Sequence, residues 1–222
     1  MIKMPKQNRN FIVARLVRIA YRSLKGKTFG LLLRDEMSGC GSLLDIGCGK
    51  DSPVKYVIGR GYSVGLDGYK PYLLKSKKAQ LHDDYVLASI NDLCFSPKSF
   101  QTVVLIDVLE HLSKSAGYKI MNQMESLATS KVIVFTPNGF LEQQKYEGNA
   151  YQRHLSGWTV CELENQGFTV YGVNGLKFFL KEKAELRINR WWYFELVILS
   201  EALAYRFPKI AFQLLAVKKV IN

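Results

Sequence analysis

The chain has 222 residues, of which 48% are hydrophobic and 23% charged, and its formal net charge at pH 7 is +12. This length can bury one substantial core, and the composition is that of an α/β protein rather than a disordered or fibrous chain. The four cysteines form no C-x-x-C pair, which favours free thiols in a reducing compartment. No secretory signal is visible at the amino terminus, so we expect a cytoplasmic protein.

The amino-terminal segment carries much of the positive charge. Arg15, Arg18 and Arg22 share one face at helical spacing, while Leu16 lies toward the other. The pattern predicts a basic amphipathic helix, and we assign residues 1–38 to a helical N-terminal extension. Three roles stay open for it: a cover over the fold, peripheral contact with an anionic membrane surface, or contact with an acidic substrate or nucleic acid.

A glycine turn follows the first strongly apolar run. Leu43 to Ile46 predicts a buried strand, and Gly47-Cys48-Gly49 lets the backbone turn sharply against a ligand, because glycine accepts positive φ and has no Cβ. A dinucleotide site would place a third glycine where Ser52 stands. Asp45, in the mouth of the turn, would repel a pyrophosphate and attract a cation such as the ammonium or sulfonium of S-adenosylmethionine (SAM).

A second predicted strand ends in an acidic residue, at the distance along the chain where an acid that binds ribose is expected. Tyr62 to Asp67 lies about twenty residues further on, the distance at which an acid reaches ribose hydroxyls across a βαβ unit. With these features, residues 40–220 resemble the class I SAM-dependent methyltransferases. The resemblance implies SAM as cofactor, bound by Asp45, Gly47, Cys48, Gly49, Asp67, Gly68, Ser89, Ile90 and Asp107.

Later segments follow the order of that family. Ala88 to Phe95 stands where the family cups the adenine, with Ser89 in the usual Asp position, so its hydroxyl and the backbone at Ile90 are expected to supply the contact. Phe100 to Leu112 looks like strand four with its acidic, histidine-containing continuation, and Asp107 is expected to line the methionine pocket. Residues 131–139 look like strand five, and residues 157–167 like a helix before strand six. The resemblance implies a Rossmann-like, mainly parallel seven-stranded α/β sheet with helices on both faces and an antiparallel last strand, within residues 39–222.

Two histidines are candidate general bases. Methyl transfer from a sulfonium is an in-line displacement, and a hydroxyl acceptor must also lose a proton. His111 directly follows the end of strand four, and His154 lies in a polar loop on the same edge of the sheet. Asp107, Glu110, His111 and His154 also allow an alternative in which they bind a divalent metal, as in small-RNA ribose 2′-O-methyltransferases and some quinone O-methyltransferases. We predict the metal-free form, because many metal-free relatives share the Glu-His pair.

An insertion precedes the last strand. Residues 176–210 stand where the resembled fold has a short hairpin connection, and they include Arg190-Trp191-Trp192 before a further apolar run. Charged residues interrupt the segment, so it does not predict a transmembrane helix. We favour a lid over the pocket, with an interfacial anchor as the alternative.

The sequence therefore predicts a SAM-dependent methyltransferase acting on a small-molecule, glycan or lipid-like acceptor, at a hydroxyl. The alternatives are a SAM-binding, non-catalytic regulatory partner and an RNA ribose 2′-O-methyltransferase. Nucleic acid is the less favoured acceptor, because the tetrapeptide that clamps a flipped base amine is absent after strand four and no nucleic-acid-binding module is present. If its role is contact with an anionic membrane surface, the basic helix would place this cytoplasmic enzyme peripherally on the membrane.

Overall fold

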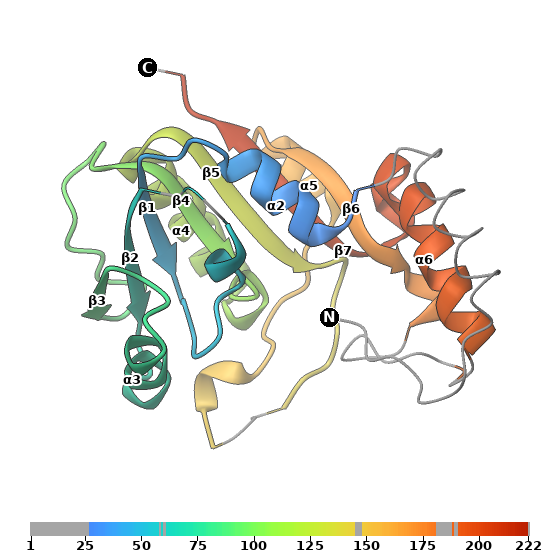
Figure 1. Cartoon of the computed structure of the whole chain (residues 1–222), viewed down its shortest axis with the longest axis horizontal. Helices are drawn as coiled ribbons and strands as arrows, with labels where there is room; N and C mark the ends of the chain where they lie inside the picture. Colours follow the sequence, from blue (N-terminus) through green and yellow to red (C-terminus); the bar gives the residue numbers. More distant parts are fainter. Residues whose placement is uncertain are drawn as a thin grey trace.

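The computed structural model describes residues 27–57, 59, 61–144, 148–180, 188 and 191–221, with only the backbone for 191–195. Its centre is a seven-stranded sheet in the order β3-β2-β1-β4-β5-β7-β6 (Figure 1). Only β7 runs against its neighbours, pairing antiparallel with both β5 and β6. The predicted mainly parallel sheet with an antiparallel last strand is confirmed. The basic helix predicted around Arg15 to Arg22 lies outside the described residues.

The elements follow the βα alternation that the sequence indicates. The strands are β1 (Ser42–Ile46), β2 (Tyr62–Asp67), β3 (Asp84–Leu87), β4 (Phe100–Ile106), β5 (Ala128–Pro137), β6 (Thr169–Leu176) and β7 (Ala211–Lys219). The α-helices are α2 (Phe29–Met37), α3 (Lys70–Lys78), α4 (Lys114–Leu127), α5 (Val160–Asn165) and α6 (Trp191–Arg206). Short 3-10 turns include η1 (Pro53–Tyr56), η2 (Leu109–His111), η3 (Ala150–Gln152), η4 (Lys177–Phe179) and η6 (Pro208–Ile210).

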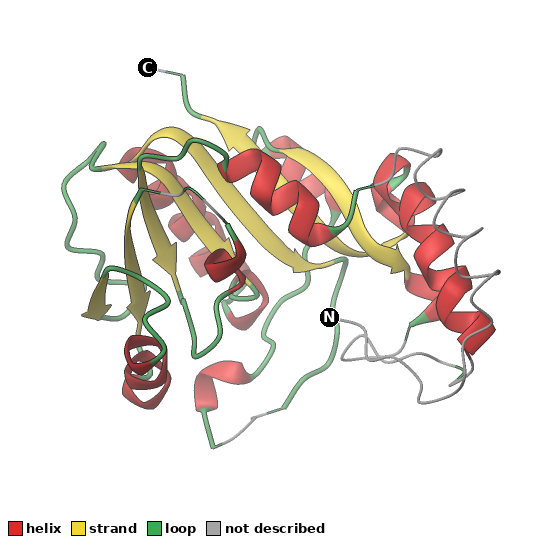
Figure 2. Ribbon diagram, in the orientation of Figure 1, coloured by secondary structure: helices red, strands yellow, loops and turns green. Residues whose placement is uncertain are grey.

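Helices cover both faces of the sheet (Figure 2). On one face, α2 and η1 bury an apolar cluster that includes Leu32, Met37 and Val54. On the other, α4 and α5 bury a larger cluster that includes Met124 and Leu163. Because the central strands are buried on both faces, they read as continuous apolar runs rather than as alternating ones. This packing holds the carboxyl ends of β1, β2 and β4 at one edge, where the site forms.

Helix α5 is shorter than the predicted span of residues 157–167. It begins only at Val160, after Thr159 forms a capping box with Glu162. Gly157 cannot enter a helix here, because its backbone passes Phe140 so closely that an added Cβ would lie 2.2 Å from the Phe140 nitrogen. The two residues before the cap therefore belong to a loop that crosses the carboxyl end of β5.

The insertion of residues 176–210 contains α6, which packs along the edge strand β6 (Figure 1). Gly172 allows the close approach, since a Cβ there would lie 2.1 Å from the Ala204 carbonyl oxygen. The Ser200 hydroxyl joins the two elements by accepting a hydrogen bond from the Leu176 amide at 3.0 Å. Among the residues that the structure describes, no helix combines the length and apolar character needed to cross a bilayer.

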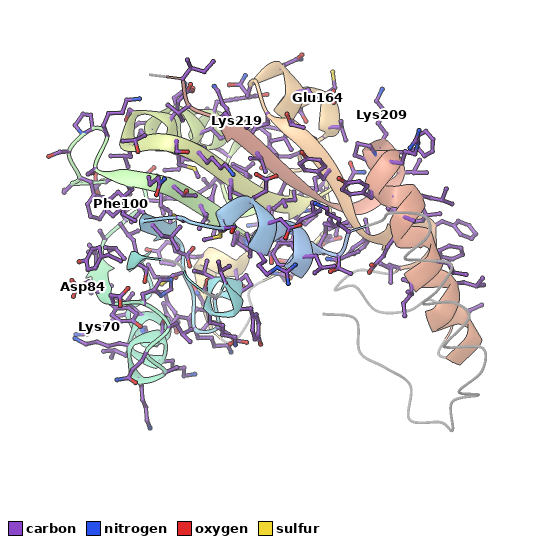
Figure 3. All side chains as sticks on the ribbon, turned by 45° about the horizontal axis from the view of Figure 1, so that its top comes forward. Lys70, Asp84, Phe100, Glu164, Lys209 and Lys219 are labelled. Atoms are coloured by element: carbon purple, nitrogen blue, oxygen red, sulfur yellow. The ribbon has the colours of Figure 1, made fainter. Side chains whose placement is uncertain are left out.

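The insertion lies far from the β3 edge. Lys70 at the start of α3 and Asp84 at the start of β3 occupy one end of the molecule, while Lys209, just after α6, lies toward the other (Figure 3). The predicted aromatic start of the lid, around Trp191 and Trp192, has no described side chains.

Candidate active site

A cavity of about 480 Å³ opens at the carboxyl ends of β1, β2 and β4. Every residue predicted to bind the cofactor lines it: Asp45, Gly47, Cys48, Gly49, Asp67, Gly68, Ser89, Ile90 and Asp107. Its wall also includes residues that the motifs do not indicate, notably Tyr151 and Gln152 of the η3 turn and Asn149, which caps that turn. Among the described residues, none from α6 contributes to the lining, so the described part of this helix is not a lid over the cavity.

The glycine turn lies tightly against its surroundings. Gly47 has φ +71°, and an added Cβ would lie 2.4 Å from a methyl carbon of Val108. The amides of Gly47 and Cys48 both donate to the Leu66 carbonyl, at 2.7 and 3.0 Å, which fastens the turn to β2. Burial raises the pKa of the Cys48 thiol, so this side chain stays neutral and contributes shape rather than nucleophilic chemistry.

Asp67 connects the glycine turn to the loop after β2. One carboxylate oxygen accepts from the Gly49 amide at 2.8 Å and the other from the Tyr69 amide at 2.7 Å. Burial raises the pKa of Asp67, although these two amides partly counteract the shift. Each oxygen retains a further lone pair, so the carboxylate can accept from a diol in the cavity without releasing the loop.

Asp45 is buried beneath the turn and held by two side chains. The Ser52 hydroxyl donates to Oδ2 at 2.6 Å, and Nε2 of His82 lies 3.0 Å from the same oxygen. His82 is a residue that sequence reasoning missed, because it follows α3 in a polar stretch with no motif around it. Its Nδ1 is buried without a partner, which assigns the hydrogen to Nε2 and makes His82 a donor to Asp45.

The segment expected to contact the adenine, Ala88 to Phe95, contributes Ser89 and Ile90 to the cavity wall. Ser89 is exposed in the cavity wall, and Ile90 is half-buried beside it. The Ser89 hydroxyl accepts from the Asn91 amide at 3.2 Å, and its carbonyl accepts from the Asp92 amide at 3.0 Å. The turn thus fixes the Ser89 backbone, and the hydroxyl proton stays available for a ligand.

Backbone bonds bring the two predicted histidines together although 43 positions separate them. The amides of Leu155 and Ser156 both donate to the Glu110 carbonyl, at 2.8 and 3.1 Å. Trp158, fully buried, donates to the Ser156 hydroxyl at 2.9 Å and anchors the loop. As a result, the rings of His111 and His154 meet edge to face with their centres 4.8 Å apart.

The histidine pair adjoins the cavity through one member. His111 lines the cavity, and His154, which does not line it, contacts the His111 ring. Burial lowers the pKa of His111 to about 4, and burial also lowers the pKa of His154. Both imidazoles are therefore neutral near pH 7.

Ligand atoms of Glu110, His111 and His154 lie within 4.8 Å of one another. Glu110 is 3% exposed, and one carboxylate oxygen accepts from the Thr136 hydroxyl at 3.0 Å. Its pKa is raised well above the usual value, first by burial and then by the nearby charge of Asp107. Asp107 itself takes φ +52°, an uncommon backbone conformation for a side chain other than glycine.

Comparison with known proteins agrees with this geometry. Residues 44–133, from β1 into β5, match the family model described as a methyltransferase domain. The matched residues 44–133 include the glycine turn, both strand-end acids and His111. Among curated proteins no match is found.

Solved structures share the fold over nearly the whole chain. A chain from the complex between the Haloferax volcanii Trm112 methyltransferase activator and the putative methyltransferase has a TM-score of 0.58 at 13% identity, covering 96% of each chain. A SAM-dependent methyltransferase from Archaeoglobus fulgidus has a TM-score of 0.56 at 15% identity, covering 96% of this chain and 100% of that one. The plantazolicin methyltransferase BpumL, in complex with SAH, has a TM-score of 0.53 at 12% identity, covering 97% and 87%. The family match over residues 44–133 and these folds agree with the resemblance: the chain has the fold of the class I SAM-dependent methyltransferases, and residues 44–133 are similar to a methyltransferase domain.

Proposed function

We propose that the cavity binds SAM and that the enzyme transfers its methyl group to a hydroxyl of a small-molecule, glycan or lipid-like acceptor. The observation that carries the proposal is the arrangement of two buried strand-end carboxylates around one cavity, with two neutral histidines at its rim.

The cavity suits this cofactor in size and in chemistry. About 480 Å³ lies within the usual range for ligand pockets, roughly 300–1,000 Å³. Asp67 offers acceptors for a ribose diol, and Asp45 offers a negative charge for an α-ammonium. Gly47 and Gly49 supply a wall without side chains, and Ser89 with Ile90 would contact the adenine.

The residues of this chain contribute alignment and proton removal. SAM supplies an electrophilic methyl group on its sulfonium. The acceptor oxygen forms the new C–O bond as the C–S bond breaks, and the electron pair of the C–S bond stays on sulfur. Asp45 and Asp67 fix the cofactor, so the acceptor approaches from the rim. There, a neutral imidazole of His111 or His154 can take the hydroxyl proton, and Asp107 lines the intervening wall.

The rim has both apolar and polar surface. Tyr151, which lines the cavity, and Leu155, which follows His154, are exposed, and Gln152 also lines the cavity. Such a mixture supports an acceptor that has hydroxyls as well as apolar groups.

Calorimetry with S-adenosylhomocysteine (SAH) and with NAD tests the cofactor half of the proposal. SAH should bind and NAD should give no heat. Asp67→Ala should weaken SAH binding by about 1.5–3 kcal/mol, the usual cost of losing hydrogen bonds to a charged group. Tight NAD binding, or SAH affinity unchanged in Asp67→Ala, would overturn it.

The acceptor half is tested by transfer of a labelled methyl group from SAM to hydroxyl compounds in the three acceptor classes. His111→Ala and His154→Ala should keep SAH affinity, and the variant lacking the base should lose on the order of a hundredfold in turnover. SAH binding without turnover on any acceptor would instead support a non-catalytic regulatory partner, and transfer only to RNA would support a ribose 2′-O-methyltransferase.

A further inference from the structure

His82 is a fully buried histidine behind the cofactor cavity, in a segment without a motif. It lies in the turn between α3 and β3, and its side chain is 0% exposed. Nε2 of its ring lies 3.0 Å from Oδ2 of Asp45, whereas Nδ1 is buried without a hydrogen-bond partner among the described residues. A buried nitrogen without a partner costs free energy that an apolar side chain would not. What the imidazole offers in return is one N–H directed at Asp45.

A gap in the sheet surface gives His82 its path to Asp45. Asp45 of β1 pairs with Gly65 of β2, and Gly65 pairs in turn with Tyr85 of β3. Side chains at one register position of neighbouring strands share a face, so these three residues form a row with no side chain in the middle. The His82 ring fills that place, because a Cβ on Gly65 would lie 2.8 Å from its Nδ1.

The two outer strands fix the position of the ring. The His82 amide donates to the Tyr85 hydroxyl at 2.8 Å, and that hydroxyl donates to the Ser76 carbonyl at 3.0 Å. The rings of His82 and Tyr85 also meet edge to face, with their centres 5.7 Å apart. The next residue, Asp83, accepts from the amide and the hydroxyl of Ser63 at 2.8 and 2.6 Å. Contacts within the protein therefore position the imidazole without any help from a ligand.

We propose that His82 is a positioning residue for the amino-acid end of SAM. Its Nε2–H and the Ser52 hydroxyl both hold Oδ2 of Asp45, and this leaves Oδ1 to accept from the α-ammonium of the cofactor. Asp45 lines the cavity and His82 does not, so His82 acts through Asp45. The inference rests on the proposed function, since it requires a ligand that carries an ammonium group.

The choice of a histidine preserves the charge that the ligand needs. Asp45 is 1% exposed, so its carboxylate depends on donors within the protein. Two donors on one oxygen also oppose the rotation that would exchange Oδ1 and Oδ2. A hydrogen on Nδ1 would have no acceptor, so the ring donates from Nε2 as a neutral group. A lysine or arginine in its place would compensate the negative charge and weaken its attraction for a cation.

Calorimetry on the full chain tests this role with SAH and with 5′-methylthioadenosine, a nucleoside that lacks the ammonium. His82→Met keeps an apolar side chain in the space and removes the N–H. It should weaken SAH binding about tenfold or more and change methylthioadenosine binding by less than about twofold, because hydrogen bonds to charged groups are strong. His82→Gln can place an amide N–H near the position of Nε2, and it should keep SAH affinity within about threefold of wild type.

Two further variants separate positioning from packing. Leu81→Met is the matched control, because Leu81 precedes His82, is also buried and receives the same new side chain. It should leave the ratio of the two affinities unchanged. In Asp45→Asn the charge that His82 directs is already absent, so adding His82→Met should weaken SAH binding by less than about twofold more. A full additional loss would mean that His82 acts by another route, and would overturn the proposal.

Imidazole NMR spectra test the bond between His82 and Asp45 without a ligand. The His82 ring should carry its hydrogen on Nε2, with an N–H signal protected from exchange with water, and Asp45→Ala should remove that protection. A hydrogen on Nδ1, or protection unchanged in Asp45→Ala, would overturn the proposal. This measurement and His82→Gln decide the question even where His82→Met fails to fold.

The ligand measurements have outcomes that contradict the proposal equally clearly. Equal losses for SAH and methylthioadenosine in His82→Met would show a purely structural role, and unchanged SAH affinity would show none. SAH binding as weak in His82→Gln as in His82→Met would also overturn it, because the N–H would not be what matters. A wild-type chain that binds neither ligand, but shows the protected N–H, would instead refute the proposed function and leave the bond between His82 and Asp45 standing.

Discussion

Asp45→Asn removes the charge from the cavity with little disturbance of the fold, because of how Asp45 is held. Both structural donors, the Ser52 hydroxyl and Nε2 of His82, contact the same oxygen, Oδ2. An asparagine can place its carbonyl oxygen there and keep both bonds, while its NH₂ group takes the position of Oδ1. Asp67 does not allow this replacement, because backbone amides donate to both of its oxygens and one would then face an NH₂ group.

The expected loss follows from the chemistry at the Oδ1 position. Under the proposed function, a carboxylate oxygen of the wild type faces the ligand's α-ammonium, whereas in Asp45→Asn the NH₂ group, itself a donor, faces that ammonium. Hydrogen bonds to charged groups contribute about 1.5–3 kcal/mol. We therefore expect SAH to bind about 2–3 kcal/mol more weakly, roughly 30- to 150-fold in Kd.

The assay compares SAH with 5′-methylthioadenosine, which has the same nucleoside but lacks the amino acid. Calorimetry should show the full loss for SAH and a change of less than about twofold for methylthioadenosine, since Asp67, Ser89 and Ile90 are untouched. Equal losses for both ligands would mean that Asp45 acts by shaping the turn, and unchanged SAH affinity would mean that the ammonium lies elsewhere. Either result refutes the charge argument.

Other predictions concern packing, protonation and the amino-terminal segment. Gly65→Ala should cost about 1–3 kcal/mol of unfolding free energy in urea melts, because its Cβ would lie 2.8 Å from Nδ1 of His82 and force the ring to move. The NMR signal of His111 should titrate near pH 4 rather than near the usual 6.5. Because the unfolded chain binds that proton at higher pH than the folded one, this group should reduce stability as pH falls from 6.5 to 4. Charging Leu16 and Val17 should abolish cosedimentation with anionic vesicles if the basic segment is an interfacial helix; wild-type binding in that variant would argue against it.

The sheet and the cofactor cavity were predictable because both depend on local sequence patterns. Apolar runs that carry Asp45 one residue before the end of β1 and Asp67 at the end of β2 mark the carboxyl ends of these strands, which pair in parallel with Asp45 opposite Gly65. Parallel strands bring such ends to one edge, so a motif at each strand end suffices to assemble the cavity. The short α5 was not predictable in the same way, since its start depends on how closely Gly157 passes Phe140.

Contacts between distant segments account for what the motifs missed. His82 reaches Asp45 across 37 positions, and its burial follows from the packing of α3 against β2. Likewise, Asn149 and Tyr151, at the start of the η3 turn, enter the cavity wall because the loop after β5 folds back over η2. No periodicity or spacing in the sequence encodes either approach.

The two halves of the site are therefore held by different kinds of interaction. The cofactor half is fixed within neighbouring strands, by amides of Gly47 and Gly49 that bond to β2 and to the acid at its end. The proposed acceptor half is held by bonds between distant segments: the Glu110 carbonyl accepts from the Leu155 and Ser156 amides, and the buried Trp158 anchors the same loop. A loop held this way can change length and composition without disturbing the strand ends. Cofactor motifs thus predict the chemistry of the donor, whereas the proposed acceptor side is built by contacts between distant segments that no local motif encodes.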